Sequence, residues 1–213
     1  MVSAASPTNR QLRKDARAQE ILTAALGVFQ ARGFAAATIA DVAQAAGVAN
    51  GTVYLYYPSK QDLFKAVVRD LMAPSVERIE EAALAAATPV EQLHVALEQW
   101  SAIMDRNGGC LTKLLVAEAG NFPDLVEFFR REVSSRVRRM LKRILSDGVA
   151  CGVFRPCDIP AVIRILTASV VMSSLWRNAL PEEPEFAVTP LALLPSLLDV
   201  VLNGITTESP RSS

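Results

Sequence analysis

The feature that most constrains this sequence is the pattern of a helix, a glycine turn and a second short helix between Thr38 and Lys60. Thr38 is placed to cap the first helix, and Asp41 three residues later completes a capping-box pattern. Gly47 is predicted to end that helix, because glycine tolerates the left-handed conformation of a helix C terminus. A second helix is expected to begin at Asn50. This pattern predicts a helix-turn-helix, whose second helix enters the major groove of DNA.

The second helix is predicted to bury Val53 and Tyr57, which lie four residues apart, and to expose a polar and aromatic face. That outer face consists of Asn50, Gly51, Thr52, Tyr54, Leu55 and Tyr56. No arginine or lysine occurs between Ala49 and Ser59, so bidentate reading of guanine by arginine is excluded here. Asn50 could pair with adenine, unless it caps the helix in place of Ala49.

The run TIADVAQAAGVANGTVYLYYPSKQDLF, which starts at Thr38, resembles the N-terminal motif of the TetR family of bacterial transcriptional regulators. Residues 18–33 resemble the first helix of that family. The resemblance implies a dimeric repressor that binds a palindromic DNA operator and responds to a small apolar or amphipathic effector. It implies phosphate contacts from Thr38, Tyr54 and Lys60, and base contacts from Asn50, Gly51, Thr52 and Tyr56. Further phosphate or minor-groove contacts are expected from the basic residues of an N-terminal arm, Arg13, Lys14 and Arg17.

Apolar residues at helical spacing and the absence of long alternating patterns predict an all-α fold. We expect a flexible arm at 1–10, a helix-turn-helix domain at 11–58, a helical effector-binding and dimerisation domain at 59–205, and a flexible tail at 206–213. A long helix is predicted from Ser59 toward Leu84, with a bend near Pro74. Further helices are predicted to begin at Pro89, Leu111, Pro123, Ile159 and Pro190.

The charges are unevenly distributed along a chain that carries 22 basic and 22 acidic residues. The first 60 residues hold six basic and three acidic residues, which leaves 16 and 19 for the remainder. A basic N-terminal segment would be attracted to a polyanion, although an imbalance of three charges can also arise by chance. The helix from Pro123 has a basic face as well, which is either a second nucleic-acid surface or, as we favour, a solvated helix face.

The last two predicted helices, 159–179 and 190–203, are apolar around most of their circumference. One packed face does not need so many apolar residues, so a second copy of the chain is expected to cover the rest. We therefore predict a homodimer through these two helices, with packing inside one chain as the alternative.

The resemblance also implies an effector cavity in the C-terminal domain. Large, adaptable or isolated polar residues are its candidate lining, although residues of each kind more often belong to an ordinary core. They are Trp100, Met104, Leu114, Glu118, Phe122, Phe129, Met172 and Trp176.

Catalytic and metal sites are not expected. The chain has a single histidine, His94, and lacks paired metal-ligand spacings, a phosphate-binding glycine loop and a nucleophile motif. We therefore predict that it is not an enzyme and needs no cofactor or metal. The alternative to a DNA-binding regulator is a helical ligand-binding or structural protein without operator recognition.

The location is predicted to be cytoplasmic, because residues 1–11 lack the apolar core of a secretory signal. No membrane contact is expected, since the apolar stretch 161–176 contains Arg164 and falls short of the ~20 residues of a span. Three cysteines, Cys110, Cys151 and Cys157, suit a reducing compartment. Cys151 and Cys157 could form a redox switch or act as small buried apolar residues.

Overall fold

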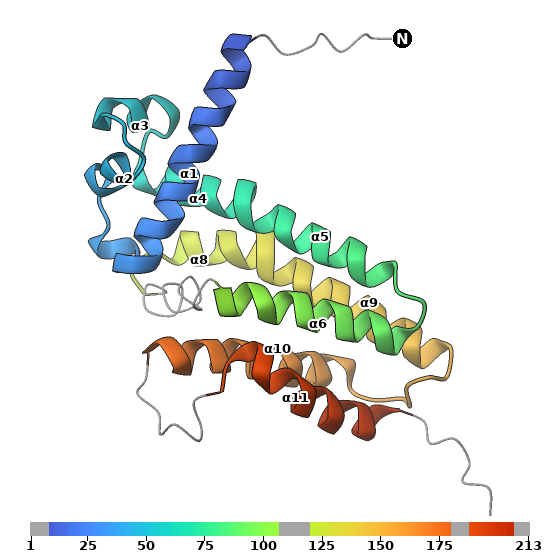
Figure 1. Cartoon of the computed structure of the whole chain (residues 1–213). Helices are drawn as coiled ribbons and strands as arrows, with labels where there is room; N and C mark the ends of the chain where they lie inside the picture. Colours follow the sequence, from blue (N-terminus) through green and yellow to red (C-terminus); the bar gives the residue numbers. More distant parts are fainter. Residues whose placement is uncertain (1–8, 107–119, 180–187, 207–213) are drawn as a thin grey trace, which may run out of the picture. The chain divides into compact units, whose positions relative to one another are not determined.

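The structure is a computed structural model that describes residues 9–106, 120–179 and 188–206 (Figure 1). These residues are helical, apart from turns and an isolated antiparallel bridge between Phe154 and Thr206, so the predicted all-α fold is confirmed. The chain divides into two compact units, Met1–Leu71 and Met72–Ser213. The helix predicted to begin at Leu111 lies outside the described residues.

The first unit contains α1 (Asn9–Ala36), α2 (Ile39–Ala45), α3 (Asn50–Tyr56) and α4 (Lys60–Val67). Three fully buried phenylalanines from α1 and α4 form its centre: Phe29, Phe34 and Phe64 have ring centroids 5.4–5.9 Å apart. Such tilted and edge-to-face contacts add to the free energy gained by burying the rings. Val42 of α2 and Val53 of α3 are also fully buried, which anchors both short helices to this core.

The helix predicted from Ser59 toward Leu84 is divided by a π-helical turn, and the predicted bend near Pro74 stays a prediction. After α4 the chain passes through a π-helical turn, η1 (Val68–Met72), into α5 (Ala73–Leu84). Pro74 lies in the first turn of α5, and proline has no N–H to donate to the preceding turn. The wider π turn absorbs this loss of a regular hydrogen bond.

The second unit is arranged around α6 (Pro89–Arg106), which contacts α5, α9, α10 and α11 (Figure 1). Leu93, Ala96 and Leu97 of α6 are fully buried in these contacts. The remaining helices are α8 (Pro123–Phe129), the π-helical turn η2 (Arg130–Ser134), α9 (Ser135–Ala150), α10 (Ile159–Ala179) and α11 (Pro190–Ile205). The predicted helices that begin at Pro89, Pro123, Ile159 and Pro190 are thus confirmed.

The turn after α9 is joined to the end of α11. The N–H of Phe154 donates to the carbonyl of Gly148 at 2.9 Å, which places the buried Phe154 ring directly on that glycine. Arg155 donates from its backbone N–H to the Ile205 carbonyl and from Nε to the Gly204 carbonyl, both at 2.6 Å. The C-terminal helix is therefore held by side chains and backbone of the α9–α10 connection.

Helix α10 buries only one side. Its outer face carries a stripe of apolar residues at helical spacing, which we call the α10 stripe: Ala161, Ile165, Ala168, Met172 and Trp176. Ile165 is 53% exposed and Trp176 is 43% exposed. On α11, Val200 is 72% exposed. Exposed apolar residues in this number mark an interaction surface.

The 18 residues Ile159–Trp176 of α10 are long and apolar enough to cross a membrane, judged by length and composition alone. The stretch predicted to be too short, 161–176, lies inside this segment, whose 18 residues reach the lower end of the range for a span. One third of this segment is buried within the chain. Arg164 lies near its middle, where a charge is costly in a bilayer.

Candidate DNA-reading site

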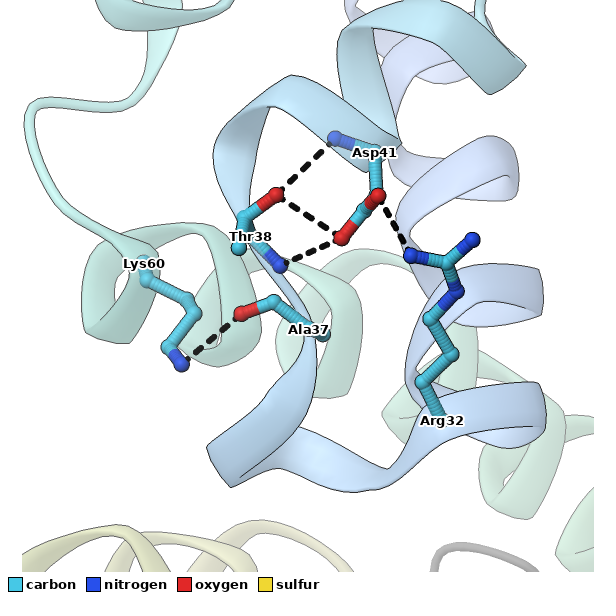
Figure 2. A network of polar contacts seen from close by, with 5 residues as sticks. All are labelled: Arg32, Ala37, Thr38, Asp41 and Lys60. Carbon is cyan, nitrogen blue, oxygen red and sulfur yellow. Dashed lines mark hydrogen bonds and ion pairs between the residues drawn. The ribbon is translucent and has the colours of Figure 1, made fainter.

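The N terminus of α2 is fixed by a capping box, as predicted. Figure 2 shows the N–H of Asp41 donating to Oγ1 of Thr38 at 3.1 Å, while the Thr38 N–H and hydroxyl both donate to Oδ2 of Asp41, at 2.9 and 2.7 Å. Arg32 from α1 donates to the other carboxylate oxygen at 2.5 Å. These hydrogen bonds from Thr38, followed by the charge of Arg32, lower the pKa of Asp41. Asp41 therefore stays ionised as the cap at neutral pH.

The turn after α2 is a Schellman motif, which confirms Gly47 as the end of the helix. Gly47 has a φ of 64°, its N–H donates to the Gln44 carbonyl, and the Val48 N–H donates to the Ala43 carbonyl. A residue with a side chain would be strained in this left-handed conformation. The turn thus sets the angle at which α3 leaves α2.

Helix α3 presents most of its surface to solvent. Val53 is fully buried, whereas Tyr54 is 52% exposed and Leu55 is 81% exposed. The helix begins after Ala49, which makes no side-chain cap, and the side chain of Asn50 makes no hydrogen bond within the described part of the chain. Asn50 and Gly51 are exposed, and Thr52 and Tyr56 are half-buried. Asn50 therefore does not take over the capping role that would have occupied its amide.

Tyr57 is the C-cap residue of α3, and its predicted burial is found only in part. Its side chain is half-buried beside Tyr56, with ring centroids 6.3 Å apart. Burial, followed by the negative charge of Asp70 and ionised Tyr56, raises the pKa of Tyr57 to about 12. Tyr57 is thus a neutral packing residue. Tyr54, by contrast, is the exposed tyrosine of α3.

Lys60 points its ammonium at the end of α1. Nζ donates to the carbonyl oxygens of Phe34, Ala35 and Ala37 at 2.7, 3.0 and 2.9 Å, and it lies 4.6 Å from the centre of the Phe34 ring. Figure 2 shows the bond to Ala37, next to the Thr38 cap. An ammonium has three donors. A phosphate contact by Lys60 stays a prediction, and it would have to replace one of these carbonyls.

The basic residues assigned to the N-terminal arm lie in α1. Arg13, Lys14 and Arg17 are exposed residues near the start of this helix, which begins at Asn9, and Arg17 forms an ion pair with Glu20 at 2.6 Å. These contacts were predicted to come from an arm, whereas the three residues belong to a helix that starts earlier than its apolar periodicity indicates. Their contact with DNA stays a prediction.

Comparison with known proteins explains this architecture. Residues 21–67 match the family described as bacterial regulatory proteins, tetR family, and residues 91–186 match the C-terminal domain of AefR-like transcriptional repressors. The chain is 30% identical over 193 residues to the HTH-type transcriptional repressor KstR2 of Mycolicibacterium smegmatis, which covers 89% of this chain and 91% of the relative. This chain belongs to the TetR family. It is accordingly a DNA-binding transcriptional regulator, from a family of regulators rather than enzymes.

Other relatives agree with this assignment. The fatty acid metabolism regulator protein of Bacillus subtilis is 26% identical over 190 residues, 87% of this chain and 94% of the relative. The crystal structure of Bacillus subtilis FadR in complex with stearoyl-CoA has a TM-score of 0.73 at 24% identity, and covers 88% of this chain and 98% of its own. The structure of Mycobacterium tuberculosis KstR2 has a TM-score of 0.69 at 23% identity, and it covers 97% of this chain and 100% of its own. These two structures show that the chain shares their fold over 88% and 97% of its length.

The predicted effector-contacting residues are dispersed over the C-terminal unit of this TetR-family chain. Trp100 is buried in α6, Met104, Phe122, Phe129 and Met172 are half-buried, and Trp176 is exposed. Leu114 and Glu118 lie outside the described residues. The assignment of these eight residues to a ligand pocket stays a prediction.

Three buried serines among the described residues of this unit were missed by sequence reasoning, and the first, Ser173 of α10, donates to the carbonyl of Val188 at 3.3 Å. Ser174 of α10 donates to the carbonyl of Met104 at 3.3 Å, and Ser101 of α6 is fully buried with no hydrogen-bond partner for Oγ in the described part of the chain. A buried hydroxyl without a partner is energetically unfavourable. The signal in the sequence was a serine at a core position of an otherwise apolar helical face.

Proposed function

We propose that this protein is a homodimeric repressor that binds a two-fold symmetric operator through α3 and releases it when the C-terminal unit binds an amphipathic effector. The observation that carries the proposal is α3 itself: a short helix, anchored by the capped α2 and a Schellman turn, whose exposed face includes Asn50, Gly51 and Tyr54. A helical protein without operator recognition has no need of such a projecting face. We place the protein in the cytoplasm, where its operator is.

The dimer is assigned to α10 and α11. The α10 stripe and Val200 of α11 expose apolar side chains that a two-fold partner would cover with the same surface. TetR-family regulators are dimers. Two α3 helices held about 34–36 Å apart would meet successive turns of the major groove on one side of the duplex.

The effector class is inferred from the relatives. One relative is a fatty acid metabolism regulator, and a FadR structure similar to this chain holds stearoyl-CoA. An apolar chain joined to a polar head agrees with the apolar helices of the C-terminal unit and with the buried Ser101 hydroxyl of α6, which has no partner among the described residues. We therefore propose an acyl thioester as the effector. Its binding lowers operator affinity if it favours a conformation in which the two α3 helices are wrongly spaced.

Gly51→Ala tests the DNA-reading role of α3. A Cβ built on Gly51 has no heavy atom within 4 Å, so alanine fits the protein and stabilises it by about 0.5–1 kcal/mol through its higher helix propensity. Against an operator obtained by selection from random duplexes, the added methyl is expected to weaken binding by about tenfold or more, because it stands where the backbone approaches the bases. Fluorescence anisotropy measures the affinity and thermal unfolding measures the stability.

The matched control is Gly27→Ala in α1, where a Cβ also meets no atom within 4 Å. It should gain stability to the same extent and keep the affinity for the operator. Equal operator affinity for Gly51→Ala and the wild type would show that α3 does not approach DNA at this position.

A further inference from the structure

A groove about 520 Å³ in volume lies between α9 and α10 and is bordered mainly by cations. Arg138, Arg139 and Lys142 come from α9, and Arg164 comes from α10. Arg130 also borders the groove, but its guanidinium already forms a two-pronged ion pair with Glu127. Among the residues that the structure describes, no acidic side chain borders the groove. Its volume falls within the range of about 300–1,000 Å³ that small-molecule sites occupy.

The basic residues of α9 divide into two sets. Arg136 forms an ion pair with Glu77, and Arg143 lies 3.9 Å from Asp147. By contrast, Arg138, Arg139 and Lys142 have no carboxylate partner among the described residues. The residues without partners are thus the ones that border the groove. On a helix face that is only solvated, we would not expect the cations without carboxylate partners to be the ones beside a groove.

The three groove cations of α9 are close to one another in helical register. Arg138 and Lys142 are four residues apart, and Arg139 and Lys142 are three apart, spacings at which like charges on a helix repel. Arg164 adds a fourth positive charge from the facing helix. A multiply charged anion in the groove would relieve this repulsion and could accept charge-assisted hydrogen bonds from several donors at once.

The groove also has an apolar part. Pro160 and Ile163 of α10 contribute to its lining beside Arg164. A ligand that combines phosphate groups with an organic portion matches this lining, with phosphates toward α9 and the organic portion over Pro160 and Ile163. A concave site of this volume suits a small molecule better than a DNA duplex.

We propose that the groove between α9 and α10 is a binding site for a small molecule that carries several phosphate groups. The groove lies on residues 160, 163, 164 and 167 of α10, next to the α10 stripe at 161, 165 and 168. The source of the phosphates is either a free nucleotide or the nucleotide portion of a thioester effector. The proposal of this site depends only on the groove, and it does not require the effector proposed above.

Binding is tested by titration calorimetry on the full chain at ~0.15 M salt with three probes: inorganic tripolyphosphate, ATP and coenzyme A. Arg138→Gln and Arg139→Gln are each expected to weaken binding by about tenfold, since each removes a charge-assisted contact. Arg143→Gln is the control, because it removes the same charge from the same helix outside the groove. It should leave the affinities within about twofold.

Thermal unfolding without ligand separates this site from a structural role. Removing one of several repelling cations should leave the melting temperature of Arg138→Gln equal to or above that of the wild type. A lower melting temperature with unchanged probe binding would overturn the proposal. So would the absence of binding of all three probes to the wild type, or equal losses in Arg143→Gln and the groove variants.

The source of the phosphates is read from the ranking of the probes. A preference of about tenfold or more for coenzyme A over ATP and tripolyphosphate assigns the groove to a thioester head, and the opposite ranking assigns it to a free nucleotide. If a palmitoyl thioester of coenzyme A releases the operator and Arg139→Gln needs about tenfold more of it, the groove belongs to the effector site. If the thioester releases the operator equally from both proteins while ATP binding depends on Arg139, the groove is a separate nucleotide site. Weaker operator binding by Arg139→Gln with no probe bound would contradict the small-molecule site and indicate a DNA contact.

Discussion

A double variant, Ile165→Asp and Val200→Asp, is expected to be a folded monomer that has lost most of its operator affinity. The two side chains are 53% and 72% exposed in the single chain, so a carboxylate at either position remains solvated in the monomer. In a two-fold dimer through α10 and α11, both carboxylates and their symmetry copies would be buried without partners. Such burial costs several kcal/mol for each charge, enough to weaken the dimer by about a thousandfold or more. Light scattering coupled to size exclusion measures the mass.

The control for the dimer variant is Leu12→Asp, an equally exposed leucine in α1 at 54%. It should keep the mass of a dimer. Circular dichroism of the double variant should match that of the wild type, which would exclude misfolding as the cause of a lower mass. If the double variant stays dimeric at micromolar concentration, the subunits meet through another surface.

Gly148→Ala is expected to destabilise the C-terminal unit by about 2 kcal/mol. A Cβ at this position would overlap Cδ2 and Cε2 of Phe154. The Phe154 ring is fully buried, and its backbone N–H is bonded to the Gly148 carbonyl, so the ring has little room to move away. Overpacking of this kind typically costs 1–3 kcal/mol, which exceeds the ~1 kcal/mol gained from the helix propensity of alanine. The free energy of unfolding is measured by urea denaturation.

Gly204→Ala in α11 is the matched control, since a Cβ there meets no atom within 4 Å. It should leave stability unchanged or raise it by up to about 1 kcal/mol. In the background Phe154→Ala, the cost of Gly148→Ala should disappear, because the overlapping ring is gone. A stable Gly148→Ala single variant would mean that Phe154 is not packed against this glycine.

The features predicted from the sequence are those that depend on residues close together in the chain. Thr38 and Asp41 are three residues apart, and the turn at Gly47 needs only its own backbone conformation and two local hydrogen bonds. The bend predicted near Pro74 has an equally local reason. Such features follow from capping and steric rules that apply before any tertiary contact forms.

Most of the features that were not predicted depend on residues far apart in the chain. Lys60 donates to the Phe34 carbonyl across 26 residues, and its partners could not be inferred from the turn around it. The groove cations come from both α9 and α10, so their sequence pattern resembles a solvated helix face until the two helices are packed together. The helical start of α1 is also invisible to apolar periodicity, because residues 12–17 are exposed on all sides.

The central claim is that two α3 helices read one operator from a two-fold dimer, and its most direct test is methylation protection on a duplex selected by the wild-type protein. The account predicts two symmetric patches of protection in the major groove, with centres about one helical turn, or a whole number of turns, apart. These patches should disappear with the Ile165→Asp, Val200→Asp variant and weaken with Gly51→Ala. A single asymmetric patch, or protection confined to the minor groove, would contradict it.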